Sequence, residues 1–195
     1  MRMTATKEGS QYLLNGKKSF VTNGGVADKY VVFAKTDPTR GRRGISAFAL
    51  DKGLPGISYS SKDDKIGMRG IPSCSISFSD VAVSKKYLLG EEGDGFKIAM
   101  EALNRSRPAV GAQALGIAES AMETATLFAM RRRQFGKPIA KLEGMQFMLA
   151  EMATMIESAK ALVYKAAWHL DKGLRHATKY SAMCKYFASD VAMKI

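Results

Sequence analysis

The sequence has 195 residues, 46% of them hydrophobic, which is enough for one large domain or two small ones with a buried core. Thirty lysines and arginines against 18 acidic residues give a net charge of +12, which favours an anionic partner. No apolar run is long enough to span a bilayer, and the first residues lack the apolar core of a signal peptide. Cys74 and Cys184 fit no metal or redox spacing, so we predict no metal site and a reduced intracellular setting.

The first part of the chain, to about residue 85, has the pattern of short strands separated by turns. Asn15-Gly16 lies between two such strands, and this pair is typical of a tight hairpin. The other strands follow from apolar runs or from alternation with period two. The predicted strands are residues 11–14, 18–22, 29–34, 45–50, 57–59, 74–78 and 81–83. Such spacing favours an antiparallel β-barrel or sandwich.

The second part of the chain has helical periodicity. One apolar stripe extends over residues 96–128 and contains Pro108, which we expect to kink the helix. A second helix is predicted over residues 145–170, and a third from about Ala177. Long helices with narrow apolar stripes favour an antiparallel bundle.

These patterns predict an α+β chain of two domains. Residues 1–87 form the β module and residues 88–195 the long-helix bundle. Residues 191–195 are still in helical period, and residues 3–6 enter a strand without a preceding partner. We therefore expect a fragment that is incomplete at both ends.

A basic segment follows the first long helix. The arginines at 131–133 are followed by Phe135, Gly136 and Pro138, which we expect to stop the helix. Arginine stays charged and makes bidentate hydrogen bonds to phosphate oxygens, so this segment is a candidate phosphate clamp. A solvated basic turn that offsets the helix dipole is the alternative interpretation.

Five segments resemble, in order, the acyl-CoA dehydrogenase family. They are residues 12–24, 65–70, 95–100, 132–139 and 146–153. The match extends over essentially the whole sequence and corresponds to the central β domain and the first part of the C-terminal helical domain. The family's N-terminal domain and C-terminal end are not matched. The resemblance implies FAD as cofactor, an acyl-CoA substrate, an electron-transfer flavoprotein as electron acceptor, and a homotetramer.

The resemblance implies that Phe20, Val21 and Thr22 lie on a strand against the flavin ring. The family commonly has tryptophan at Phe20, and phenylalanine keeps the apolar wall but loses the indole donor. Thr22 offers its hydroxyl and backbone to the N5/O4 edge of the flavin.

A second implied group is Arg132, Gln134 and Phe135, at positions that reach the FAD of a neighbouring subunit. Arg132 is expected to pair with the pyrophosphate. Glu143 falls near the adenosine portion, but a carboxylate close to phosphates is repulsive, so we leave it out of the site.

The implied substrate-binding residues lie on the first long helix. Asn104, Arg105 and Arg107 fall on the CoA-contacting segment, and Leu103 and Val110 are expected to line the acyl channel. At Asn104 the family often has aspartate. A solvated helix face remains an open interpretation for both arginines.

No catalytic base is predicted within these residues. The implied reaction removes an α-proton with a carboxylate while the β-hydride moves to the flavin. One branch of the family places that carboxylate at the position of Ser106, and serine cannot replace it. We assign the role neither to Glu101 nor to Glu119, and expect the base downstream of Ile195. The 195 residues alone are therefore expected to be inactive.

The predicted function is the α,β-dehydrogenation of an acyl-CoA thioester by a flavoenzyme. Three alternatives stay open: a nucleic-acid-binding flavoprotein of the same fold, an oxygen-using acyl-CoA oxidase, and an inactive scaffold. FAD and CoA phosphates already account for the main arginines, so we expect no nucleic acid and no membrane insertion. The acyl chain length is not specified. The cytoplasm is the expected location in a bacterium, and the mitochondrial matrix stays open.

Overall fold

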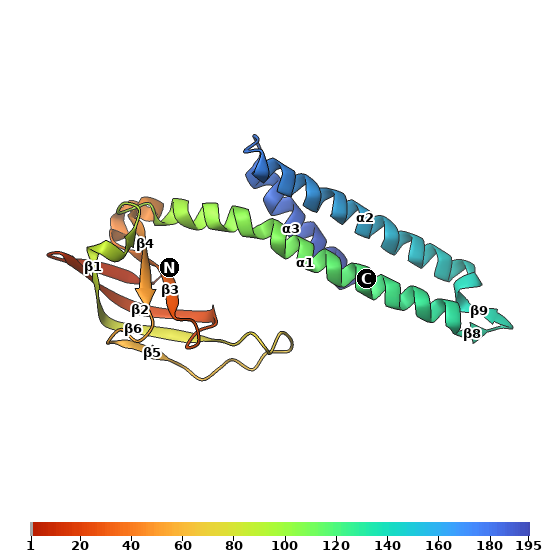
Figure 1. The fold of residues 1–195 in the computed structure, drawn as a ribbon, viewed down its shortest axis with the longest axis horizontal. Coiled ribbons are helices and arrows are strands. Elements are labelled where there is room, and N and C mark those ends of the chain that lie inside the picture. Colours follow the sequence, from red (N-terminus) through yellow and green to blue (C-terminus); the bar gives the residue numbers. More distant parts are fainter. Residues whose placement is uncertain (1) are drawn as a thin grey trace. The chain divides into compact units, whose positions relative to one another are not determined.

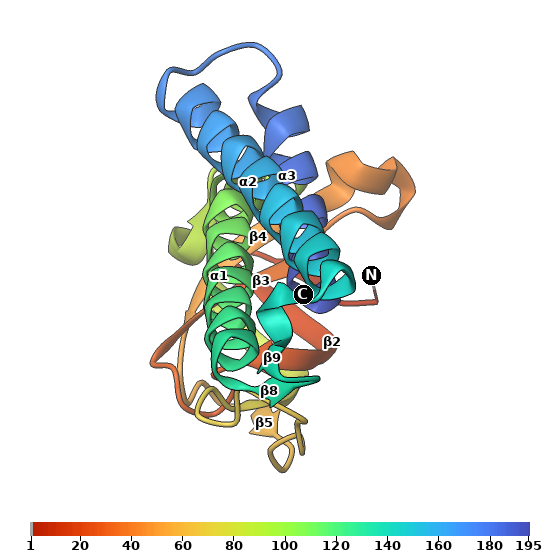
Figure 2. The same ribbon diagram turned by 90° about the vertical axis from the view of Figure 1, so that its right-hand side faces the viewer.

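A computed structural model describes residues 2–195, which divide into two compact units. The first unit ends at Met100 and is mostly β structure, and the second extends from Glu101 to Ile195 and is helical (Figures 1 and 2). The predicted α+β class, a β module followed by a helical bundle, is confirmed. The domain boundary between residues 87 and 88 stays a prediction.

The described strands of the first unit form one seven-stranded sheet, in the order β5-β6-β2-β1-β3-β4-β7. The strands are β1 (Thr4–Glu8), β2 (Gln11–Thr22), β3 (Lys29–Lys35), β4 (Ile45–Asp51), β5 (Ile57–Tyr59), β6 (Ser73–Ser84) and β7 (Leu88–Leu89). Neighbours pair antiparallel, except that β1 and β3 pair in parallel where Thr4 meets Lys35. Short 3₁₀ helices occupy Pro38–Gly44 and Lys85–Tyr87.

The sheet curls around its own core, as in a barrel. The rings of Tyr12 on β2 and Phe48 on β4 lie 5.1 Å apart, edge to face. Because β1 and β3 separate these strands, a flat sheet would hold them about 14 Å apart. Curling therefore brings inward-facing side chains of distant strands together. The buried side chains of this core include Met3, Ala5, Leu14, Val32, Ala34, Leu50, Ile76, Phe78, Val81 and Val83.

The hairpin predicted at Asn15-Gly16 is wrong, because both residues lie inside β2. The register against β6 shifts between Leu14 and Gly16, and Gly16 has a φ of 135° there. The Asn15 side chain bridges to β6: its Nδ2 donates to Asp80 Oδ1 (2.8 Å), and its Oδ1 accepts from the Asp80 N–H (2.9 Å). Pairing with the long strand β6 overrides the local turn signal, and between these pairs β6 advances three residues while β2 advances two, so the bulge lies in β6 opposite Asn15.

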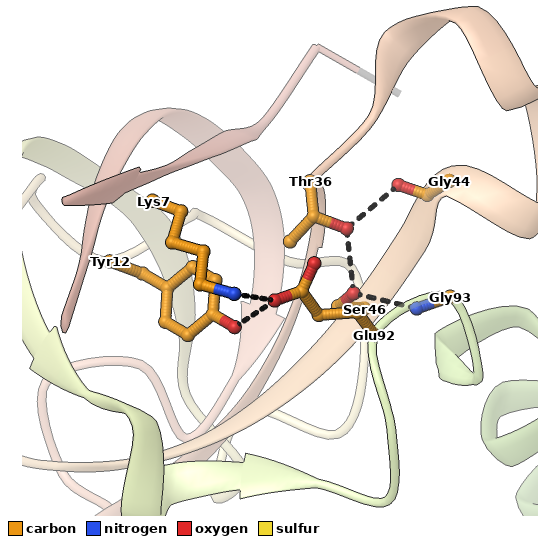
Figure 3. Close-up of polar contacts among 7 residues, drawn as sticks. All are labelled: Lys7, Tyr12, Thr36, Gly44, Ser46, Glu92 and Gly93. Carbon is orange, nitrogen blue, oxygen red and sulfur yellow. Dashed lines mark hydrogen bonds and ion pairs between the residues drawn. The ribbon is translucent and has the colours of Figure 1, made fainter. Parts of the chain in front are cut away.

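The loop before α1 (Gly95–Arg131) is fastened to the β module. The Glu92 carboxylate accepts hydrogen bonds from the Tyr12 hydroxyl and from Lys7 Nζ (2.9 Å), while the Gly93 N–H donates to Ser46 Oγ at 3.0 Å (Figure 3). Burial, together with Glu92, raises the pKa of Tyr12 to about 12. The hydrogen bonds from Tyr12 and Lys7 lower the pKa of Glu92. This cluster fixes the entry to α1.

The second unit consists of most of α1 with α2 (Glu143–Asp171) and α3 (Ala177–Lys194). A small hairpin of β8 (Arg133–Gln134) and β9 (Lys137–Pro138), followed by a 3₁₀ turn at Ile139–Lys141, joins α1 to α2. The helices bury small and apolar residues against one another: Leu115, Ala118, Ile156, Ala159, Val163, Ala166, Cys184, Ala188 and Val191. Within residues 2–195, no helix is long and apolar enough to cross a membrane.

Helix α1 continues through Pro108. Proline has no N–H, so the carbonyl of Asn104, four residues earlier, loses its partner in the helix. The hydroxyl of Ser181 on α3 donates to this carbonyl at 2.6 Å, and Ser181 is completely buried. A side chain of α3 thus replaces the backbone donor that proline lacks, and this ties α1 to α3.

Replacing Ser181 by alanine should leave the Asn104 carbonyl without a donor. We expect a loss of about 1–3 kcal/mol in the free energy of unfolding, the usual effect of an unsatisfied buried polar group. Denaturant unfolding of the purified protein measures the change. Ser158→Ala is the control, because the exposed Ser158 hydroxyl donates a hydrogen bond to the Thr154 carbonyl of its own helix, α2. Equal stability of the two variants would contradict the assignment.

Tyr12→Phe should destabilise the protein by about 0.5–1.5 kcal/mol at pH 7, because the partly exposed Glu92 carboxylate loses one hydrogen bond and keeps the one from Lys7. The difference in unfolding free energy from the parent protein should shrink below pH 4.5, the ordinary pKa of Glu92. As the pH falls, Glu92 is protonated first in the unfolded state, because its pKa is lowered in the folded state. The difference should also shrink above pH 10, because Tyr12 ionises there in the unfolded state and only near 12 in the folded state.

Denaturant unfolding at pH 4, 7 and 10.5 tests this pH dependence. Tyr164→Phe is the matched control, since Tyr164 is 67% exposed. A difference between Tyr12→Phe and the parent protein that is the same at all three pH values would show that the Glu92 contact does not carry the effect.

Candidate functional site

The end of β2 presents an exposed aromatic side chain on a strained backbone. Between Lys18 and Val21, β2 advances three residues while its partner β6 advances two, so one extra residue forms a bulge. Phe20 lies in this bulge with a φ of 56°, and it is 82% exposed. A left-handed backbone is unfavourable for a bulky side chain, by about 1–3 kcal/mol. Packing within the described chain does not repay this strain.

The two residues that follow Phe20 differ in burial. Val21 is half-buried and packs against the core of the β module, so it anchors the strand end. Thr22 is exposed and pairs with Ser73 of β6 through the backbone. The strand end therefore offers a flat apolar ring close in sequence to an exposed hydroxyl.

The hairpin after α1 also presents an exposed phenylalanine with a left-handed backbone. Phe135 and Gly136 are its two turn residues, with φ values of 52° and 75°, as in a type I′ turn. Phe135 is 85% exposed, and Gln134 beside it is exposed as well. A phenylalanine in the left-handed region is again unusual, because this turn normally takes Asn or Gly.

The arginines before this turn differ in what they contact. Helix α1 ends at Arg131, Arg132 follows it, and Arg133 opens β8, so the expected end of the helix near these arginines is confirmed. Arg133 donates to the Gly136 carbonyl at 3.0 Å and so closes the turn. All three are exposed, and among residues 2–195 none forms an ion pair. Arg131 and Arg132 present positive charge that no carboxylate of the described chain neutralises.

Near its start in the second unit, helix α1 presents a partly apolar face. Leu103, Arg107 and Val110 have the spacing i, i+4, i+7 and share one face. Leu103 is 44% exposed and Val110 is 42% exposed. This face combines apolar surface with one cation.

The side chain of Asn104 is held at both ends. Its Nδ2 donates to Thr178 Oγ1 at 3.0 Å, and its Oδ1 accepts from Arg107 at 3.0 Å. Arg105 is exposed and lines a cavity of about 260 Å³ with Leu170 and Asp171. An anion in that cavity would meet the carboxylate of Asp171 as well as Arg105. Asn104 and Arg107 are therefore brought together, and Arg105 lies apart from their hydrogen-bonded network.

Three other polar residues of α1, to which we assign no base role, make contacts of a different kind or are exposed. The Ser106 hydroxyl donates to the Leu103 carbonyl of its own helix at 3.2 Å. Glu119 pairs with Lys160 of α2 at 3.1 Å, and Glu101 is exposed. In the described range, no three His, Cys, Asp or Glu side chains lie close enough to hold a metal ion.

Two residues of this region had no signal of their own in the sequence. Thr178 and Ser181 lie on α3, more than 70 positions after Asn104, which they contact. Pro108 was the available hint, because a proline inside a helix predicts a free carbonyl four residues earlier. The sequence did not indicate which residue would supply the donor.

Comparisons with known proteins agree with this architecture. The family described as acyl-CoA dehydrogenase, middle domain, matches residues 1–81, and the acyl-CoA dehydrogenase C-terminal domain matches residues 93–195. An acyl-CoA dehydrogenase of Bacillus subtilis (strain 168) is 50% identical over 194 residues, which cover 100% of this chain and 51% of that relative.

Two solved structures are similar throughout the chain. Butyryl-CoA dehydrogenase from Megasphaera elsdenii has a TM-score of 0.94 and 48% identity, covering 99% of this chain and 50% of the other. The FAD complex of PigA has a TM-score of 0.95 and 31% identity, covering 100% of this chain and 50% of the other. The chain thus spans about half the length of the curated relatives it matches. Because the two family matches include nearly all of its residues, the chain belongs to the acyl-CoA dehydrogenase family.

Proposed function

We propose that the protein is an FAD-dependent acyl-CoA dehydrogenase that removes hydrogens from the α and β carbons of an acyl-CoA thioester. The observation that carries the proposal is the exposed ring of Phe20, which a strained bulge holds at the end of β2, two residues before Thr22. Such strain is typical of ligand-binding positions. The proposal also rests on membership of the family.

The donor set fits FAD. A flavin ring is planar, and Phe20 offers it a flat apolar surface, while Val21 holds the strand end and Thr22 supplies a hydroxyl for the polar edge. When bound, FAD supplies the acceptor for the hydride that leaves the β carbon. The FAD complex among the similar structures supports this cofactor.

The turn after α1 fits the anionic part of the same cofactor. Arg132 has no acidic partner among the described residues, so its guanidinium is free to pair with a pyrophosphate. Gln134 and Phe135 supply an amide and an exposed ring beside it. We assign these three residues to FAD held by a second copy of the chain, which requires association, and the family resemblance leads us to propose a homotetramer.

The substrate residues lie on α1. Arg107 offers a cation to the CoA portion, with Asn104 and Arg105 nearby in sequence, and Leu103 and Val110 offer apolar surface to the acyl chain. Butyryl-CoA, named for one similar structure, supports a short acyl thioester. We assign removal of the α-proton to a carboxylate in the part of the family fold that these residues do not span. We propose that an electron-transfer flavoprotein accepts the electrons.

Anaerobic bleaching of the flavin tests the reaction. Full-length protein loaded with FAD should lose its flavin absorbance band when butyryl-CoA or octanoyl-CoA is added. Acetyl-CoA is the control, because it has no β carbon and cannot be dehydrogenated across the α and β carbons. A flavin band that neither butyryl-CoA nor octanoyl-CoA bleaches would contradict the proposal. Rapid recovery of the band in air would identify an oxidase.

Arg132→Gln should weaken FAD binding by about ten- to a hundredfold, the usual effect of losing a charge-assisted hydrogen bond. Flavin fluorescence titration of the apoprotein measures the Kd. Arg131→Gln is the matched control, since it removes the same charge one position earlier and should change the Kd less. Equal losses in both variants would indicate a general field of positive charge instead of a specific contact.

A further inference from the structure

The Asn104 side chain has a fixed orientation in the helical unit. A guanidinium can only donate hydrogen bonds, so the contact with Arg107 requires the Asn104 oxygen. The amide NH₂ must then face Thr178, whose hydroxyl oxygen accepts it. The chemistry of the two partners leaves one orientation of the amide in which both hydrogen bonds form.

Helix α3 holds Asn104 through the backbone as well. Ser181, one turn after Thr178, is completely buried and donates to the Asn104 carbonyl. Two side chains of one face of α3 thus hold the main chain and the side chain of the same residue. Asn104 therefore links α1 to α3 by two hydrogen bonds, one from its side chain and one to its backbone carbonyl.

Arg107 depends on this link for its direction. It is half-buried, and among residues 2–195 it forms no ion pair, so its charge stays free for a ligand. Its hydrogen bond to a neutral amide orients the guanidinium without neutralising it. Loss of the Thr178 hydroxyl would release the amide and, with it, the direction of the guanidinium.

We propose that Thr178 is a positioning residue that acts through the Asn104 amide to aim Arg107 at the acyl-CoA ligand. In this arrangement the Asn104 amide supports Arg107. The inference rests on the proposed function, in which Arg107 binds the CoA portion. It adds a residue of α3 to the determinants of substrate affinity.

Thr178→Val tests the inference, since it removes the hydroxyl and keeps the shape of the side chain. We expect the KM and the calorimetric Kd for butyryl-CoA to rise about fivefold, as for one neutral hydrogen bond. The kcat of the FAD-loaded full-length protein should stay within about twofold, because a positioning contact for binding acts equally on ground and transition states. Thr178→Ser keeps the hydroxyl and should behave like the parent protein.

A double-mutant cycle tests whether Thr178 acts through Asn104. Asn104→Leu alone should raise the Kd, and adding Thr178→Val should raise it no further. Thr154→Val is the control, because that exposed hydroxyl bonds only to the Ala150 carbonyl of its own helix. Additive effects of Asn104→Leu and Thr178→Val, or no effect of Thr178→Val, would overturn the inference.

Arg107→Gln separates failure of the inference from failure of the proposed site. If Arg107→Gln leaves the Kd for butyryl-CoA unchanged, Arg107 does not bind the ligand, and both the proposed site and the inference fall. If Arg107→Gln raises the Kd while Thr178→Val does not, only the positioning role of Thr178 falls.

Discussion

The helical unit depends on a hydrogen bond that proline cannot make. Pro108 leaves the Asn104 carbonyl without its helical donor, and the buried hydroxyl of Ser181 takes that place. A polar group buried without a partner is costly, so α3 must approach α1 with Ser181 at this level. The same approach places Thr178 beside the Asn104 amide, and through it fixes Arg107. One missing N–H thus sets the register of two helices and the geometry of a candidate binding residue.

The two exposed phenylalanines show a different use of strain. Phe20 and Phe135 lie in separate units, yet both have left-handed backbones and rings that are more than 80% exposed. In each case a backbone feature imposes the conformation, a bulge for Phe20 and a tight turn for Phe135. Folding of the described residues gains nothing from either ring. Binding of a ligand would remove this apolar surface from water, which is favourable.

The positive charge is distributed in a way that suits anionic ligands. The acidic residues that form ion pairs contact Lys7, Lys29, Arg69 and Lys160, and these pairs are exposed and contribute little stability. The arginines assigned to FAD and CoA are not among them. Net positive charge therefore stays available in the segments that we assign to the phosphates of the proposed cofactor and substrate.

The amino-acid sequence by itself determined the elements that local periodicity encodes. Alternation predicted β4, the apolar run predicted β3, and the apolar stripes predicted all three long helices. The order of five segments indicated the family. The resemblance also pointed to Phe20 and Phe135, although neither φ value can be read from a phenylalanine in a sequence, because that residue normally avoids the left-handed region.

Tertiary structure decided what depends on partners distant in the chain. Asn15-Gly16 stays inside a continuous strand, opposite a bulge of β6, because β6 pairs along β2, and no local signal at that position reveals its partner. The contacts of Tyr12 with Glu92 and of Asn104 with Thr178 join residues 80 and 74 positions apart. Periodicity reports which face of an element is buried, but it does not report what that face meets. Only packing brings these side chains within hydrogen-bond distance, and the positioning of Arg107 follows from that packing.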